Sequence, residues 1–294
     1  MLAPIAIFTY KRLEHTRKTI EALVANPQAS QSEVFIYADG PRNEQDQAEV
    51  TQVRDYLKTL SGFKSVTLVE RPENLGLSAN VIDGVGALAK QYGRVIVLED
   101  DVVVSPFFLE FMNAALELYR DEDGVGAVGG YVFPHKVSFP DTFFYTKSVS
   151  WGWATWERAW AHFEPKGHKL CAALREQGVH YALIEEQARD DRFTWAALWL
   201  ASLLHAGKLI LYPGVSLARN IGHDGTGEHC PVGDLYDSAL AEVAPQVKRI
   251  PIAVHPEAPQ AFDHYYEVPP KPNFFVKLAN SCGKRWRSLR RIFN

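Results

Sequence analysis

The stretch VIVLEDDVVVSPFF, residues 95–108, places three consecutive carboxylates between two apolar runs. Two carboxylates about 4 Å apart repel by roughly 4 kcal/mol at an effective dielectric of 20, and burying an unpaired charge costs more. Glu99, Asp100 and Asp101 therefore either lie in water on a loop at a strand end or meet a positive charge. The apolar flanks disfavour an ordinary exposed loop, so the rest of the chain must decide.

The acids end the fourth of four short apolar runs that are separated by segments with helical patterns. The runs are 4–10, 33–39, 65–71 and 94–100. Nearly continuous apolar runs are expected for parallel strands that are covered on both faces. Alternation of strands and helices predicts an α/β fold, with a mostly parallel, Rossmann-like central sheet flanked by helices and joined by right-handed crossovers.

In such a sheet, ligands bind outside the carboxyl ends of the strands. All four runs end in polar residues, which in chain order are Thr9-Tyr10-Lys11-Arg12, Asp39-Gly40, Arg71-Pro72-Glu73-Asn74 and Glu99-Asp100-Asp101. The three acids therefore belong to the binding edge of the sheet. Ser105 and Pro106 are expected to begin the next helix as N-cap and first residue.

Two later segments are assigned by their neighbours in the sequence. GVGAVG (124–129) matches the dinucleotide pattern G-x-G-x-x-G, but it follows the fourth run and no helix begins after it, so we predict a fifth strand. The apolar segment 195–214 is interrupted by His205 and Lys208, and its uninterrupted part is about half of the roughly 20 residues that a membrane span needs. We predict a buried helix followed by a strand.

The composition is that of a globular protein. The chain has 294 residues, 47% of them hydrophobic, and a formal charge of −4, which gives no general case for nucleic-acid binding. Three distant cysteines indicate reduced thiols and a cytoplasmic protein. The N-terminal apolar run is short and lacks a basic start, so we expect no signal peptide.

The second half contains two segments with functional and structural alternatives. The four tryptophans of WGWATWERAW (151–160) either pack in the core or form walls on which a sugar stacks. The loop ARNIGHDGTGEHC (218–230) carries His223, Asp224 and His229 among three glycines, and it is either structural or part of a metal or phosphate site.

The last residues, 274–294, combine an apolar helical stripe with six basic residues and no acid. Such helices lie on anionic membranes, and packing against the chain's own domain is the alternative. We therefore divide the chain into one domain, 1–270, with two halves (1–130 and 131–270), and a basic amphipathic tail, 271–294. We expect a peripheral position at the cytoplasmic face of the inner membrane and no nucleic-acid partner.

An acidic strand end on a nucleotide-binding fold indicates a divalent cation beneath a diphosphate, and hard oxygen ligands suit Mn²⁺ or Mg²⁺. Over roughly residues 3–240, the sequence resembles GT-A fold glycosyltransferases. The resemblance is greatest to enzymes similar to the N-acetylglucosaminyltransferase that starts hybrid N-glycans, and to bacterial family 2-type enzymes of surface-polysaccharide clusters. The matching segments are PIAIFTYKR, YADGP, ERPENLGLSAN, VLEDDVVVSPFFLEFM, WGWATWERAW and NIGHDGTGEH.

The resemblance implies a metal-dependent, inverting glycosyltransferase, in which residues 1–130 form the nucleotide-sugar-binding half and residues 131–270 the acceptor or catalytic half. Its donor would be a nucleotide-sugar, with a UDP-sugar favoured, and its acceptor a glycan or lipid-linked glycan. It assigns the metal to Asp101 and His229. It assigns the nucleotide to Thr9, Tyr10, Arg12, Asp39, Arg71, Asn74, Gly76, Glu99 and Asp100, with Asp39 accepting from the base.

The catalytic base has to be assigned from the residues before the late strand. Related inverting enzymes carry an aspartate directly after a tryptophan, but here Trp195 is followed by alanine. Inversion by direct displacement needs one carboxylate to take the acceptor proton. We predict Asp191, then Asp190, with Glu157 third; both aspartates alternatively cap the next helix.

Two other classes of function stay open at this point. A sugar nucleotidyltransferase shares the α/β core and metal carboxylates, but it usually carries a glycine-rich loop where this chain reads TYKRLEHTRKT. A non-catalytic carbohydrate-binding protein would keep the tryptophans without needing the acids.

Overall fold

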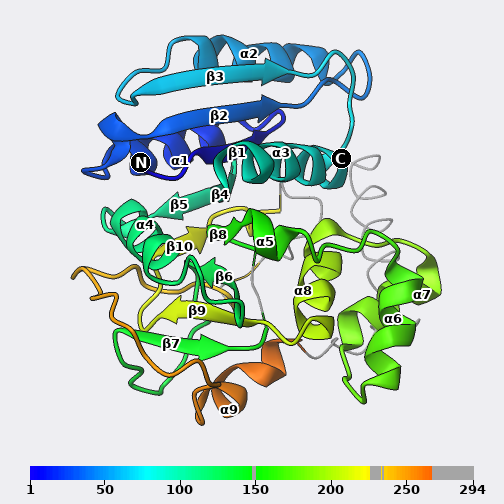
Figure 1. Ribbon diagram of the computed structural model, residues 1–294. Helices are drawn as coiled ribbons and strands as arrows, with labels where there is room; N and C mark the ends of the chain where they lie inside the picture. The colour runs from blue at the N-terminus through cyan, green and yellow to red at the C-terminus, as the bar shows by residue number, and fades with distance from the viewer. Residues whose placement is uncertain (148–149, 226–232, 234, 267–294) are drawn as a thin grey trace, which may run out of the picture.

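The computed structural model describes residues 1–147, 150–225, 233 and 235–266. In these residues the strands form one eight-stranded sheet in the order β3-β2-β1-β4-β8-β6-β9-β7, and a small two-stranded sheet, β10-β5 (Figure 1). The strands are β1 Ile5–Thr9, β2 Glu33–Ala38, β3 Ser65–Glu70, β4 Arg94–Glu99, β5 Val102–Val104, β6 Val125–Gly129, β7 Thr142–Tyr145, β8 Trp153–Trp156, β9 Leu209–Pro213 and β10 Ala218–Asn220.

The helices flank this sheet. They are α1 Leu13–Val24, α2 Gln47–Lys58, α3 Leu77–Tyr92, α4 Phe108–Leu118, α5 Glu157–Trp160, α6 Gly167–Glu176, α7 Ala182–Asp190, α8 Trp195–His205 and α9 Ala258–Phe262, with short 3₁₀ turns η1 Ala29–Gln31 and η2 Asp263–Tyr266. The predicted α/β class and mostly parallel central sheet are confirmed.

The first half is the predicted parallel sheet. β3, β2, β1 and β4 are all parallel neighbours. The central strands are buried because helices cover both faces, and Ile5, Ile7, Ile36 and Leu98 are all 0% exposed. The four predicted strands are confirmed to within a residue or two at each end.

The second half adds antiparallel pairs. β8 runs antiparallel to both β4 and β6, and β7 runs antiparallel to β9. GVGAVG forms β6, as predicted. A Cβ at Gly129 would lie 2.2 Å from the Tyr212 ring, so glycine is needed there for the ring to pack on the strand.

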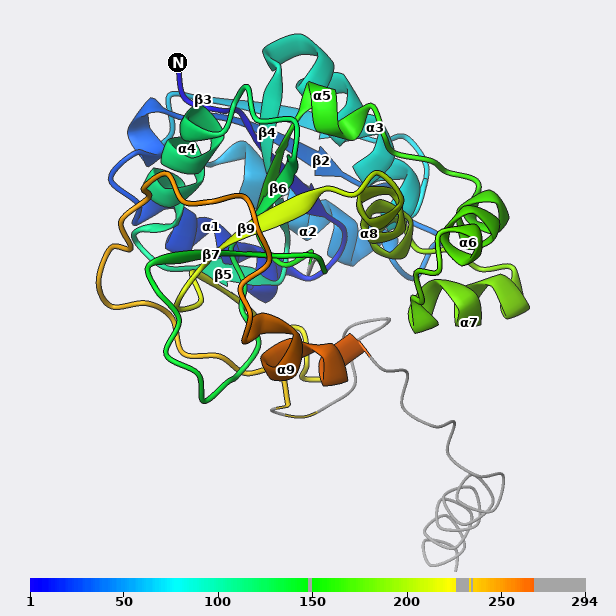
Figure 2. The same cartoon turned by 60° about the horizontal axis from the view of Figure 1, so that its bottom comes forward.

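The apolar segment 195–214 forms helix α8 and strand β9, as predicted. α6 and α7 pack on α8 with a small core of their own, which includes Leu170, Leu174, Ile184 and Leu200. In Figures 1 and 2, α6 and α7 lie beyond α8, away from the sheet. Within the described part of the chain, no helix is long and apolar enough to cross a membrane.

The start of α4 differs from the prediction. Ser105 Oγ accepts from Phe107 N at 3.2 Å, but α4 begins only at Phe108, so Ser105-Pro106 form a turn before the helix. The predicted basic tail, 271–294, lies outside the described residues. The last described elements are α9 and η2, and α9 lies beside β7 at the edge of the sheet (Figure 1). There the Phe262 ring stacks on the Phe143 ring.

Candidate active site

The four predicted strand ends meet at one edge of the sheet. In the strand registers, Phe8 pairs with Glu99, Thr9 with Ala38, and Ala38 with Glu70. Because parallel strands share their direction, the residues that follow these positions share one rim. The predicted binding edge is therefore formed.

The acid triplet consists of the last residue of β4, Glu99, and the two residues of the tight turn into β5, Asp100 and Asp101, and this turn is held from two sides. Thr19 Oγ1 of α1 donates to Asp100 O at 2.9 Å, and Ile221 N donates to Asp101 O at 2.8 Å. Asp100 and Asp101 are 5% and 4% exposed. The turn is therefore buried, and the alternative of a solvated loop is wrong.

A single arginine supplies the positive charge that these acids need. Arg12 Nη2 donates to Asp101 Oδ2 at 2.7 Å and also to Asp100 Oδ1. Burial raises the pKa of Asp100 to about 6 despite Arg12. Burial, followed by repulsion from Asp101 and Asp100, raises the pKa of Glu99 well above its ordinary value. Two aspartates share one arginine, so when both are ionised the pair carries more negative charge than Arg12 offsets.

The late loop closes over Asp101. Asn220 Nδ2 lies 3.4 Å from Asp101 Oδ1, and Gly222 N donates to Asn220 Oδ1 at 2.7 Å. A Cβ at Gly222 would lie 2.3 Å from Asp101 Oδ2, so only glycine lets the loop approach this closely. His15 Nε2 and Asp224 Oδ2, 3.2 Å apart, tie the loop to α1.

The site fits a divalent cation in charge and chemistry. Asp100 and Asp101 are adjacent buried carboxylates with excess negative charge, and carboxylate oxygens are the ligands that Mg²⁺ and Mn²⁺ prefer. Within the described residues, no group of three or more His, Cys, Asp or Glu side chains is arranged to hold a metal. The predicted second ligand, His229, lies outside those residues.

Both carboxylate oxygens of Asp39 accept hydrogen bonds from neighbouring residues, three from backbone N–H groups and one from a side chain. Oδ1 accepts from Gly40 N and Leu75 N, both at 2.9 Å. Oδ2 accepts from the Asn74 amide at 2.9 Å and from Gly76 N at 3.0 Å. The structure thus brings together the predicted Asp39, Asn74 and Gly76, and Asp39 joins the β2 end to the loop before α3.

Arg54 reinforces the same junction, and sequence reasoning missed it. Its guanidinium donates to three carbonyls at the ends of β2 and β3: Ala38 O at 3.2 Å, Asp39 O at 3.1 Å and Arg71 O at 2.5 Å. An arginine on the buried side of an amphipathic helix carries no local signal of this role, because its partners are backbone atoms of distant loops.

The remaining nucleotide-side residues differ in their surroundings. Tyr10 donates to Asp46 Oδ2 at 2.7 Å and has the Arg42 guanidinium 5.5 Å from its ring centroid. Thr9 Oγ1 is buried at the rim with no hydrogen-bond partner among the described residues. Arg71 turns toward α3, where it donates to Asn80 Oδ1 at 2.9 Å and pairs with Asp83.

The tryptophans divide between core and rim. Trp153 and Trp156 are 1% and 2% exposed and pack in the core. Trp151 is half-buried, with ring centroids 5.3 Å from His223 and 5.8 Å from Tyr236. Trp151 therefore lies beside the loop that covers Asp101, whereas the core interpretation holds for Trp153 and Trp156.

Glu157 is wrong as a candidate base. Its backbone N donates to Gly93 O, and the preceding Trp156 pairs with Arg94. Glu157 thus lies at the start of β4, whereas Glu99 is at its end, about 16 Å away at 3.3 Å per residue. Strand β8 runs antiparallel to β4, so Glu157, which follows β8, lies at the edge of the sheet opposite the acid triplet. The sequence did not indicate this antiparallel strand.

Asp190 and Asp191 lie on the exposed end of α7. Asp191 adopts the left-handed region at φ 49°, and its carboxylate lies 3.0 Å from His168 Nε2. Thr194, and neither aspartate, caps α8 by accepting from Ala197 N at 3.3 Å, so the capping alternative is wrong. No contact between described residues joins either aspartate to the acid triplet.

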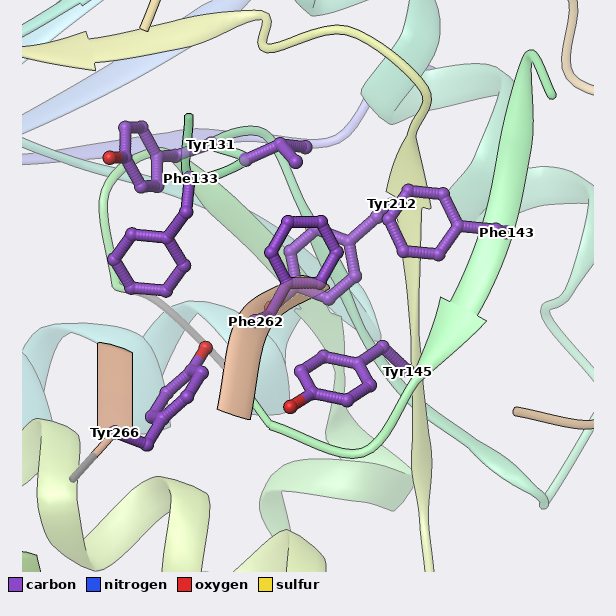
Figure 3. A pocket seen from close by; sticks show the side chains of 8 residues that line it. Tyr131, Phe133, Phe143, Tyr145, Tyr212, Phe262 and Tyr266 are labelled. Atoms are coloured by element: carbon purple, nitrogen blue, oxygen red, sulfur yellow. The ribbon is translucent and has the colours of Figure 1, made fainter. Parts of the chain in front are cut away.

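A narrow aromatic hollow lies apart from the acids, between β7, β9 and α9. Figure 3 shows its rings converging, including those of Tyr145, Tyr212 and Phe262. The Tyr145 hydroxyl donates to Asp263, and the Tyr212 hydroxyl donates to Lys147 O at 2.8 Å. The hollow is therefore an apolar packing site of the C-terminal segment.

A nucleotide-type sheet with a buried acidic turn on its binding rim defines a nucleotide-dependent enzyme of the GT-A type. Residues 5–169 match the model of glycosyl transferase family 2, and the chain belongs to this family. It is therefore a glycosyltransferase, and the family supports binding of a nucleotide-sugar donor. None of the curated proteins compared with the sequence matches it.

Three solved structures that resemble this chain are distant from it in sequence. The crystal structure of S. aureus TarS 1–349 shares 11% identity over 75% of this chain and 61% of that chain, with a TM-score of 0.43. S. aureus TarS shares 11% identity over 72% and 36%, with a TM-score of 0.41. The mannosyltransferase PcManGT from Pyrobaculum calidifontis, in complex with GDP-Man and Mn²⁺, shares 12% over 70% and 73%, with a TM-score of 0.40. This chain thus spans less than two thirds of either TarS chain.

Proposed function

We propose that this glycosyltransferase is metal-dependent and inverting, and that it moves a sugar from a nucleotide-sugar, with UDP favoured, to a glycan or lipid-linked acceptor of a bacterial surface glycoconjugate. The observation that carries the proposal is the buried acid pair Asp100–Asp101 on the rim. Its charge exceeds what Arg12 offsets, and Mn²⁺ or Mg²⁺ would complete the balance.

The metal role belongs to Asp101, with His229 as the second predicted ligand. When bound, the cation would offset the charge of the departing nucleoside diphosphate. Glu99 and Asp100 would face the ribose and diphosphate. Thr9 supports the nucleotide assignment, because its buried hydroxyl has a hydrogen-bond capacity that no described residue uses.

The acceptor side is proposed around Trp151, His223 and Tyr236, whose half-buried rings contact one another beside Gly222. Aromatic rings bind the flat apolar face of a sugar, so these rings suit a glycan acceptor. Asp191, then Asp190, would take the acceptor proton. In Figure 1, the arrowheads of β2 and β3 point to the side of the molecule on which α7 and α8 lie, which is compatible with this role.

We also propose that the enzyme is cytoplasmic and binds the inner face of the membrane through residues 271–294. The support is the run of basic residues without an acid in the sequence of this tail. Co-sedimentation with anionic liposomes, with and without residues 272–294, tests it. Equal sedimentation of the two proteins would refute the membrane assignment.

The donor assignment is tested by slow hydrolysis of a panel of nucleotide-sugars with Mn²⁺, Mg²⁺ or EDTA. A metal-dependent transferase should hydrolyse one donor in the panel and stop in EDTA. Equal hydrolysis in EDTA and Mn²⁺ would contradict the metal dependence. Absence of hydrolysis of every donor, together with no thermal stabilisation by any of them, would contradict the donor class.

A further inference from the structure

Arg12 holds an unusual position, because one nitrogen of its guanidinium contacts both aspartates of the acid turn. Nη2 donates to Asp101 Oδ2 at 2.7 Å and to Asp100 Oδ1. The Arg12 side chain is 20% exposed, and those of Asp100 and Asp101 are 7% and 5% exposed. Among the described residues, Arg12 is the one cation within ion-pair distance of either aspartate.

The contact is incomplete for a permanent structural ion pair. Arg12 Nη1 is buried and has no hydrogen-bond acceptor among the described residues. A guanidinium has five N–H donors, and buried ones are nearly always satisfied in a settled structure. Nη1 lies beside Gly222, where a Cβ would be only 3.1 Å from it, so the backbone of the late loop approaches this nitrogen closely.

Arg12 also uses the oxygen that a metal ion at Asp101 would need. Asp101 Oδ1 faces Asn220, and Oδ2 faces Arg12. A divalent cation and a guanidinium that share one carboxylate oxygen repel each other, because both are positive and lie within a few ångströms. Asp100 and Asp101 therefore cannot bind a metal ion and the Arg12 guanidinium tightly at the same time.

We propose that Arg12 is a built-in counter-ion that occupies the divalent-cation position in the donor-free protein, and that metal binding displaces its guanidinium from Asp101. The proposal rests on the proposed function for the use of a metal at Asp101. The displaced guanidinium stays on the rim because Arg12 directly precedes α1, and an incoming diphosphate would give its N–H groups, including Nη1, the acceptors they lack. Arg12 thus stabilises the empty site and makes the metal compete for it.

The test is calorimetric titration of Mn²⁺ alone, without nucleotide, into the full-length protein and two variants. Arg12→Met removes the competitor and keeps an unbranched side chain, so Mn²⁺ should bind at least tenfold more tightly, which corresponds to about 1.4 kcal/mol. Arg12→Lys keeps the charge but loses the planar fork. It should bind Mn²⁺ about threefold more tightly than wild type, because a single ammonium holds the pair less well.

The matched control is Arg17→Met, an arginine on α1, the helix that Arg12 precedes; Arg17 pairs with Glu14 and lies over Tyr56. Its Mn²⁺ affinity should equal that of wild type. Thermal midpoints supply a second readout: Arg12→Met should melt lower than wild type in EDTA and gain more from saturating Mn²⁺, since its acids have lost their counter-ion.

Three results would overturn the proposal. The first is Mn²⁺ affinity in Arg12→Met that is equal to or weaker than in wild type. The second is a Mn²⁺ affinity in Arg12→Lys that equals that of wild type. The tighter binding by Arg12→Met would then reflect the loss of a nearby positive charge and not the loss of a guanidinium that the metal must displace. The third is Mn²⁺ binding to none of the proteins. If Arg12→Met does not fold, Arg12→Lys decides the question alone. If the Mn²⁺ affinities change as expected but the wild-type protein transfers no sugar, the proposed function is wrong and the displacement of Arg12 by the metal still holds.

Discussion

Replacing Asp39 by asparagine should destabilise the whole fold. The Asp39 carboxylate accepts four N–H bonds, two on each oxygen, from Gly40, Leu75, Asn74 and Gly76. In Asp39→Asn, one oxygen becomes an NH₂ group that faces two N–H donors, so two bonds to a charged acceptor are lost. Each such bond contributes about 1.5–3 kcal/mol, so the free energy of unfolding should fall by roughly 3–6 kcal/mol.

Urea denaturation of Asp39→Asn and wild type at pH 7 measures this difference. The control is Asp83→Asn, which removes a carboxylate that is 59% exposed and pairs with Arg71. That change should cost less than about 1 kcal/mol. If Asp39 served only to read the base, its removal would weaken donor binding without altering stability. A free energy of unfolding within about 0.5 kcal/mol of wild type would therefore refute the reasoning.

Three further predictions follow from the packing and charge of named residues. Gly129→Ala should cost about 1–3 kcal/mol of stability in thermal or urea unfolding, since its Cβ meets the Tyr212 ring; an unchanged midpoint would contradict this. Glu157→Gln should leave turnover at the wild-type value, because Glu157 lies at the edge of the sheet opposite the acid triplet. Asp191→Asn should lose turnover and keep donor affinity. Wild-type turnover in Asp191→Asn would reject Asp191 as the base. In EDTA, Asp100 should make the protein about 1 kcal/mol more stable at pH 5 than at pH 7.5. The pKa of this carboxyl is raised to about 6 in the folded protein. Its contribution to stability is therefore lost as the pH rises from its unfolded pKa through 6. The same pH difference in Asp100→Asn would show that the effect has another source.

The parallel half of the fold was predictable because its strands are continuous apolar runs with polar ends. The same rule placed the acids on the rim, since parallel strands bring their carboxyl ends together. β8 was not predicted, because WGWATW combines tryptophans with small residues and reads equally well as a rim segment. The wrong choice of Glu157 follows directly from missing that antiparallel strand.

The individual side-chain contacts were less predictable than the rim itself. Asp39 was expected to face a ligand, but the long-range approach of the loop before α3 fills its oxygens with N–H donors. Arg12 was expected to hold the nucleotide, and the structure adds its pairing with Asp100 and Asp101. Both contacts join segments more than 30 residues apart, so no local pattern reports them.

The central claim is that the acid turn binds a nucleotide-sugar through a divalent cation at Asp101. Calorimetric titration of the donor found in the panel, with saturating Mn²⁺, into wild type and Asp101→Ala tests it most directly. Wild type should bind the donor with Mn²⁺ and lose affinity in EDTA, and Asp101→Ala should show no Mn²⁺-dependent binding while keeping a cooperative thermal transition. Donor binding by Asp101→Ala that equals wild type in Mn²⁺ would contradict the account.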